Sequence, residues 1–168
     1  MPLTMHQASV PIMLQMFGSL TAIIDKAAAH CEARGIDPAV LVNYRLAPDM
    51  LPFKSQIQIM TDQAKGAVSR LAGVDIPSYA DTETSFDDLK ARIAKTADYV
   101  KSFKPEQIDG SEDREVVLKI GPTELKLTGR QYFLHFFLPN FYFHAATAHD
   151  ILRHAGVQIG KRDFIGSI

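Results

Sequence analysis

The stretch that decides the fold covers residues 128–166 and reads TGRQYFLHFFLPNFYFHAATAHDILRHAGVQIGKRDFIG. Residues 132–143 within it are apolar on almost every side, and the whole stretch holds four of the six histidines. A helix that is apolar around its full circumference is typical of a position buried on all sides, in a domain core or at a subunit interface. We therefore expect one long helix here to organise the chain, followed by a short tail that docks on it.

The boundaries of this helix are marked by local signals. Thr128, with Gln131 three residues later, predicts a capping box at its start. Pro139 predicts a kink because it lacks the backbone N–H of a regular turn. Gly156 predicts its end, since glycine adopts the left-handed conformation of a helix cap at little cost.

An earlier helix is predicted near the N-terminus. Thr4 and Gln7 again fit a capping box, and apolar residues then recur at helical spacing until Gly35. Because Pro11 is favoured only in a first turn, we expect the regular helix to start around Ser9.

Two more amphipathic helices are predicted over residues 48–72 and 85–104, joined by a turn-rich linker that crosses the bundle. The pattern then changes to two short alternating runs, residues 115–120 and 124–128, on either side of a Gly-Pro turn. The expected fold is an all-α four-helix bundle with a short β-hairpin inserted before the last helix.

Composition places the chain among ordinary globular domains. Its 168 residues are 46% hydrophobic and 22% charged, which predicts a single domain over residues 1–168. The 18 basic residues are scattered among 19 acidic ones, so no basic surface for a phosphate backbone is expected and nucleic acid is excluded as a partner.

Cysteine usage and hydropathy bear on the compartment. The single cysteine, Cys31, forms no internal disulfide, which favours a reducing compartment and hence the cytoplasm. The N-terminus lacks the basic region of a signal peptide, and no run reaches the roughly 18 uninterrupted apolar residues of a membrane span. We therefore expect no membrane association.

Three segments give the chain a resemblance to a known family. They are RLAPDM (residues 45–50), PNFYFH (139–144) and ILRHAGVQIGKRDFIG (151–166). The chain resembles, over its whole length, a bacterial family of unestablished function within the DinB-like superfamily of four-helix bundles. The resemblance implies an up-down-down-up bundle, a homodimer and a cytoplasmic location, and it implies no known reaction.

Members of that broader superfamily often bind a divalent metal through three histidines, one from the second helix and an HxxxH pair from the fourth. His144 matches the first member of the pair, but Ala148 stands four residues later and His149 five. At about 100° per residue, His149 lies about 140° around the helix from His144. The position on the second helix is Gln56, whose amide is a weak ligand. The metal site is thus expected to be degenerate, with His144 as its one remaining ligand for Zn²⁺ or Ni²⁺.

The same residues allow a reading without metal. His144 is predicted to face the bundle interior and to be satisfied by a hydrogen-bond partner, with Gln56, Asn140 and Tyr44 as candidates. Asp49 is predicted in the first turn of the second helix, at the open end of the bundle. His149 is predicted to lie on the surface or on a dimer face.

Two functions remain open at this point. The first is a small-molecule-binding or stress-related bundle without a predicted cofactor, whose pocket lies between the second and fourth helices near His144, Gln56, Asn140, Tyr44 and Asp49. The alternative is a metal-dependent hydrolase or thiol transferase that uses His144. Both describe a homodimer, because so apolar a last helix would otherwise be an aggregation liability.

Overall fold

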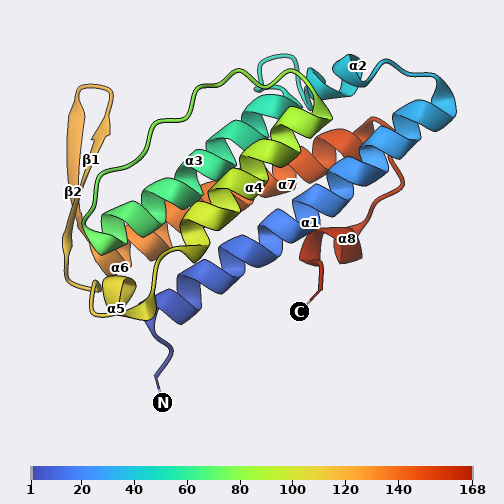
Figure 1. The fold of residues 1–168 in the computed structure, drawn as a ribbon. Coiled ribbons are helices and arrows are strands. Elements are labelled where there is room, and N and C mark those ends of the chain that lie inside the picture. The colour runs from blue at the N-terminus through green and yellow to red at the C-terminus, as the bar shows by residue number, and fades with distance from the viewer. Residues whose placement is uncertain (1, 168) are drawn as a thin grey trace.

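Four long helices, several short ones and one β-hairpin make up the described part of the chain (Figure 1). The structure is a computed structural model, and it describes residues 2–167. Its elements are, in chain order, α1 (Met5–Arg34), α2 (Pro38–Val42), α3 (Phe53–Ala72), α4 (Phe86–Lys101), α5 (Pro105–Ile108), β1 (Glu115–Ile120), β2 (Thr123–Thr128), α6 (Gly129–Gln131), the π-helix η1 (Tyr132–Phe137), α7 (Leu138–His154) and α8 (Lys161–Ile165).

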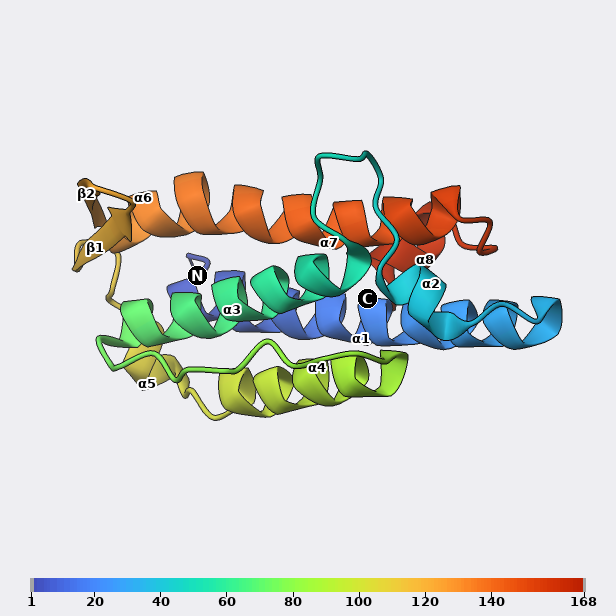
Figure 2. The same ribbon diagram turned by 90° about the horizontal axis from the view of Figure 1, so that it is seen from above.

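The long helices form an up-down-down-up bundle. α4 packs between α1 and α3, and α3 packs against α7 on its other side. Since α3 and α4 run in the same direction, residues 73–85 return along the length of the bundle to connect them (Figures 1 and 2). The antiparallel hairpin β1–β2 lies at the end of the bundle where α6 begins the continuous helical segment α6–η1–α7. The predicted all-α bundle with its inserted hairpin is confirmed.

The first helix begins earlier than predicted. Thr4 and Gln7 form the expected capping box, and α1 is helical from Met5 onward, with Pro11 inside it. Gln7 and Pro11 are both exposed. The carbonyl that loses its helical partner at Pro11 therefore faces water, which explains why the proline is tolerated in the helix interior.

Helix α3, which corresponds to the predicted second helix, begins later than predicted, at Phe53 and not at Pro48. Pro52 precedes it, and a proline disfavours helical backbone in the residue before it. The guanidinium of Arg45 donates to the Met50 carbonyl and holds the loop in place. Asp49 therefore lies in this loop, outside the first turn of the helix where it was expected.

The irregularity expected at Pro139 takes the form of a π-helix over Tyr132–Phe137. The Leu138 N–H donates to the Phe133 carbonyl, five residues back. A proline cannot supply the N–H of the next regular turn, and the wider π turn accommodates its absence.

The interior side of η1 and α7 forms the aromatic core. Phe133, Phe137 and Phe141 follow one another along the helix with ring centroids 5.4 and 5.3 Å apart, and Phe17 of α1 meets Phe141 edge-on at 6.2 Å. All four are buried, and such pairs contribute about 0.5 to 1.5 kcal/mol each beyond their buried area. The opposite side of the helix is exposed, so it is not buried all round within one chain.

The first helix is the long apolar helix of this bundle. Among residues 2–167, Met5–Arg34 is the one helix whose length and composition would also allow it to cross a membrane. Half of its most apolar 18-residue window is buried in the fold, where Leu20, Ile23 and Ile24 are fully covered. Core packing accounts for its apolar composition.

A buried ionic cluster fixes the long linker between α3 and α4. Arg92 of α4, whose side chain is 2% exposed, lies within 3.0 Å of Asp62 on α3 and of Asp81 and Glu83 on the linker. Its guanidinium also donates to the Thr61 hydroxyl and to a linker carbonyl. Although burial opposes ionisation of Glu83, hydrogen bonds from Gln58 and Arg92 outweigh it and lower the pKa of that carboxyl.

The aromatic ring of Tyr79 adds a second point of attachment. The ammonium groups of Lys65 and Lys95 lie 4.3 and 4.0 Å from its centroid, one from α3 and one from α4. Cations at this distance from a tyrosine face are attracted to it by about 0.5 to 2 kcal/mol. The linker is therefore tied to both helices that it joins.

Replacing Arg92 tests this cluster. Arg92→Ala leaves the largely buried Glu83 without the guanidinium that it shares with Asp81, and we expect the free energy of unfolding to fall by about 1 to 3 kcal/mol in urea denaturation. Lys90→Ala, two residues earlier on α4, removes surface ion pairs to Asp25 and Asp87 and is the matched control, with a smaller expected loss. Equal losses for the two variants would contradict the assignment.

Candidate functional site

His144 of α7 meets Gln56 of α3. Its Nδ1 lies 2.7 Å from the Gln56 amide oxygen, and the Gln56 amide nitrogen donates to the Leu51 carbonyl at 2.9 Å. Gln56 is 2% exposed, so both of its polar atoms depend on these partners. Because its nitrogen already donates to Leu51, its oxygen accepts from His144, and Nδ1 carries the proton.

This arrangement leaves Nε2 of His144 as the acceptor of a neutral imidazole. Burial lowers the pKa of His144 below its ordinary value, so the ring is neutral at pH 7. Among residues 2–167, no hydrogen bond to Nε2 is formed. The residue predicted to face inward and to find a polar partner does both, and Gln56 is that partner.

The residues around His144 do not form a three-histidine metal site. Gln56 occupies the position on α3 and is held by its own hydrogen bonds, while Ala148, one turn beyond His144, is fully buried and has no donor atom. Within residues 2–167, no group of three or more His, Cys, Asp or Glu side chains gathers to hold an ion. The donor set of the broader superfamily is therefore incomplete here.

His149 lies elsewhere, and within one chain it is more covered than its predicted location on the surface or on a dimer face implies. Its side chain is 13% exposed, with Nδ1 3.0 Å from Asp150 and the ring against Phe164 of α8 at 5.7 Å. Nε2 is buried without a hydrogen-bond partner among the described residues. The tail after Gly156 folds back over this side of α7, a tertiary contact that helical phase alone does not predict.

The remaining candidates do not converge on His144. Asn140 uses its amide to donate to the Phe136 carbonyl of its own helix, at 2.7 Å. Tyr44 packs its ring against His154, with centroids 6.1 Å apart, and Asp49 is exposed in the loop before α3. Of the five predicted pocket residues, the structure brings together two, His144 and Gln56.

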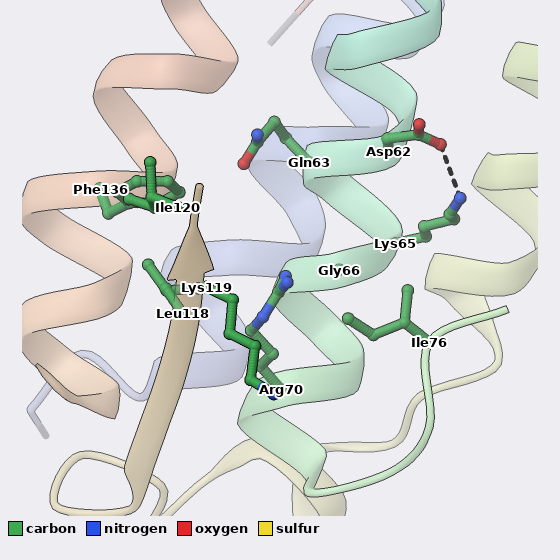
Figure 3. Close-up of a pocket in the computed structure, with 10 residues that line it drawn as sticks. All are labelled: Asp62, Gln63, Lys65, Gly66, Arg70, Ile76, Leu118, Lys119, Ile120 and Phe136. Carbon is green, nitrogen blue, oxygen red and sulfur yellow. Dashed lines mark hydrogen bonds and ion pairs between the residues drawn. The ribbon is translucent and has the colours of Figure 1, made fainter. Parts of the chain in front are cut away.

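A groove lies further along the same face of α3. Gln56, Gln63 and Arg70 recur every seven residues and so share one side of the helix. Gln63 and Arg70 line a hollow of about 360 Å³ between α3, β1, η1 and the start of the linker (Figure 3). The shared face of Gln56 and Gln63 was predictable from their spacing, whereas Arg70, one further heptad on, is the residue that sequence reasoning missed.

The groove combines cationic and apolar groups. Arg70 and Lys119 contribute positive charge, and Phe136, Ile120 and Ile76 contribute apolar surface (Figure 3). Arg70 donates to the Tyr132 hydroxyl at 3.2 Å. Burial raises the pKa of Tyr132, against the opposing influence of Arg70, so its hydroxyl stays protonated and can accept this bond.

The one carboxylate of the groove is already engaged. Asp62 lies 2.6 Å from Lys65 and 2.9 Å from Arg92, both of which are buried. Neither Arg70 nor Lys119 forms an ion pair among residues 2–167. The groove therefore presents unneutralised positive charge next to apolar surface.

The lowered pKa of His144 makes stability depend on pH. The unfolded chain takes up a proton near pH 6.5 while the folded His144 remains neutral, so the free energy of unfolding falls as the pH drops through about 6.5. We expect His144→Asn, whose amide can still donate to Gln56, to lose less stability than the wild type between pH 7.5 and 5.5 in urea denaturation. Equal losses, or an NMR pKa for His144 at or above 6.5, would contradict this.

Comparison with known proteins agrees with the fold and the resemblance. A family model described as "Domain of unknown function (DUF1993)" matches residues 5–165. A crystal structure described as a DinB family member protein from Shewanella denitrificans is 34% identical, with a TM-score of 0.88 over 97% of this chain and 92% of that chain. No curated protein matches the sequence. Because the family model spans nearly all of the residues, the chain belongs to the DUF1993 family, a DinB-like family of helical bundles.

Proposed function

We propose that this chain is a small-molecule-binding bundle whose ligand occupies the groove between α3, β1 and η1. The single observation that carries the proposal is that the half-buried Arg70 lines this groove without an ion pair among residues 2–167. A cation that is neither paired nor fully solvated favours a ligand that completes it. Lys119 is exposed and adds positive charge at the edge of the groove.

Two further features support this location. The groove volume of about 360 Å³ falls in the ordinary range for small-molecule sites, which combine apolar walls with a few polar groups. Phe136 belongs to the π-helix, and π-helical turns are frequently found at functional sites.

Another hollow of about 500 Å³ lies between α1 and the C-terminal tail. Its acidic residue, Asp163, is already paired with Lys26 at 2.5 Å and accepts from the Gly160 N–H. These contacts fasten the tail to α1 and neutralise its carboxylate. The cation of this hollow, Arg162, is exposed, whereas Arg70 is half-buried, so this hollow is the weaker candidate.

In this proposal the pair of His144 and Gln56 is structural. The competing hypothesis is a metal-dependent hydrolase or thiol transferase in which Nε2 of His144 binds Zn²⁺ or Ni²⁺. The hydrogen bond from Nδ1 would orient such a ligand, as is usual for metal-binding histidines. A lone imidazole falls short of the three protein ligands that catalytic zinc sites use.

The groove is tested by NMR with a mixture of small organic molecules. We expect chemical-shift changes to cluster on Gly66, Arg70 and Phe136, and to be absent from Thr82 and Lys95, which line a separate hollow on the linker side. Shift changes confined to the second group, or no changes at all, would contradict the proposal.

The metal hypothesis is tested in parallel by thermal unfolding with Zn²⁺ or Ni²⁺. We expect no metal-dependent rise in Tm for the wild type, and a loss of stability in His144→Ala that is the same with and without metal. The double variant Gln56→His with Ala148→His restores three histidines and should gain a metal-dependent rise in Tm, which makes it the positive control. A rise in the wild type that His144→Ala abolishes would favour the enzyme.

The homodimer is a second proposal, carried by the outer face of the last helix. Leu134, Tyr142 and Phe143 are 47%, 38% and 57% exposed there, on a helix whose other side forms the aromatic core. We place a second copy of the chain on this face, in the cytoplasm as the single reduced cysteine favours.

Light scattering after gel filtration tests the dimer. The wild type should give about twice the chain mass of 18.6 kDa, and Phe143→Lys should give the monomer mass. Val40→Lys, which changes an equally exposed apolar residue on α2, should leave the mass unchanged. A wild-type monomer, or a Phe143→Lys dimer, would exclude this interface.

A further inference from the structure

We infer that the ligand of the groove is a small organic carboxylate with an apolar body, held by Arg70. This inference rests on the proposed function and adds the chemical class of the ligand. It depends on three features of the groove: the free edge of the Arg70 guanidinium, the glycine beneath it, and the apolar wall opposite.

The Arg70 guanidinium is held by Tyr132, and only part of its hydrogen-bonding capacity is used. Nη1 donates to the Tyr132 hydroxyl at 3.2 Å, and the guanidinium carbon lies 5.5 Å from the centre of the Tyr132 ring. Among residues 2–167 no further hydrogen bond from this side chain is formed. The other N–H groups of a guanidinium form a planar fork that matches the two oxygens of a carboxylate.

Gly66 provides the space in which this guanidinium lies. A Cβ at position 66 would come within 2.5 Å of Nη1 of Arg70, one helical turn further on. The guanidinium carbon of Arg70 and Cδ1 of Ile76 follow, at 3.6 and 3.9 Å from that point. The glycine thus lets Arg70 fold back against α3 and into the groove, although a glycine in a helix interior costs stability relative to alanine.

Charge and apolar surface together define the ligand. Lys119 adds a second cation from β1, and it forms no ion pair among residues 2–167 even though Glu124 stands opposite it in the hairpin. Phe136 and Ile120 present apolar surface beside these cations (Figure 3). Inorganic phosphate would leave that surface uncovered, and an uncharged apolar molecule would leave the half-buried Arg70 without a charged partner.

Isothermal titration with three probes tests the inference: octanoate, octanamide and inorganic phosphate. Octanoate has the carboxylate and the apolar chain, octanamide keeps the chain without the charge, and phosphate keeps the charge without the chain. We expect octanoate to bind at least about tenfold more tightly than either of the others.

Two variants and one control assign the contact to Arg70. Arg70→Gln should weaken octanoate binding at least about tenfold, and Lys54→Gln, which removes a charge from the same helix outside the groove, should leave it unchanged. Gly66→Ala should weaken octanoate binding without lowering the Tm, since the nearest atoms to the added methyl group belong to the movable end of Arg70 and alanine favours the helix. A loss of affinity without a loss of stability separates displacement of the guanidinium from unfolding.

The outcomes separate this inference from the proposed function. If octanamide or phosphate binds as tightly as octanoate, or if Arg70→Gln leaves octanoate binding unchanged, the carboxylate assignment is overturned. Failure of all three probes overturns it too, while shift changes on Gly66, Arg70 and Phe136 with other molecules would still support ligand binding in the groove.

Discussion

The path of the linker between α3 and α4 depends on the guanidinium of Arg92. Two consecutive helices that point the same way need a connection that returns along their whole length, and here that connection is an irregular, polar segment. Such a segment orders only if its polar groups find partners. Arg92 forms ion pairs with Asp81 and Glu83 of this segment and donates to one of its carbonyls. The same guanidinium binds Asp62 and Thr61 of α3. Asp62 also lines the groove, but it is already paired with Lys65 and Arg92 and so does not neutralise Arg70.

Much of the fold was predictable because its decisive signals are local. The capping boxes at Thr4, Ser85 and Thr128, and the left-handed glycine caps at Gly35 and Gly73, all involve residues within one turn of each other. The errors have two sources. Helix α3 starts late because Pro52 precedes it and Arg45 holds the Met50 carbonyl in the loop before it, both local signals. His149 is covered by a distant segment, the tail, which a Lys26–Asp163 ion pair attaches to α1.

The candidate site was predictable in part for the same reason. Helical phase placed His144 inward and excluded His149 as its chelating partner, and Gln56 was one of the three hydrogen-bond partners predicted for His144. The importance of Arg70 did not follow from phase. Its role depends on two tertiary contacts: the hairpin places Lys119 in the same groove, and Tyr132 of η1 accepts a hydrogen bond from Arg70. Neither contact produces a periodic pattern in the sequence.

The π-helix changes the angle around the helix axis between Tyr132 and His144. In a regular α-helix, twelve residues would carry Tyr132 about 120° around the axis from His144, so the two could not both face α3. Yet Tyr132 reaches Arg70 and His144 reaches Gln56, two residues on one side of that helix. The wide turn over Tyr132–Phe137 takes up the difference, as if one residue had been inserted into a regular helix. A regular α-helix over the same residues would meet α3 at His144 alone, so the groove at Arg70 depends on the local widening of the helix as well as on its side chains.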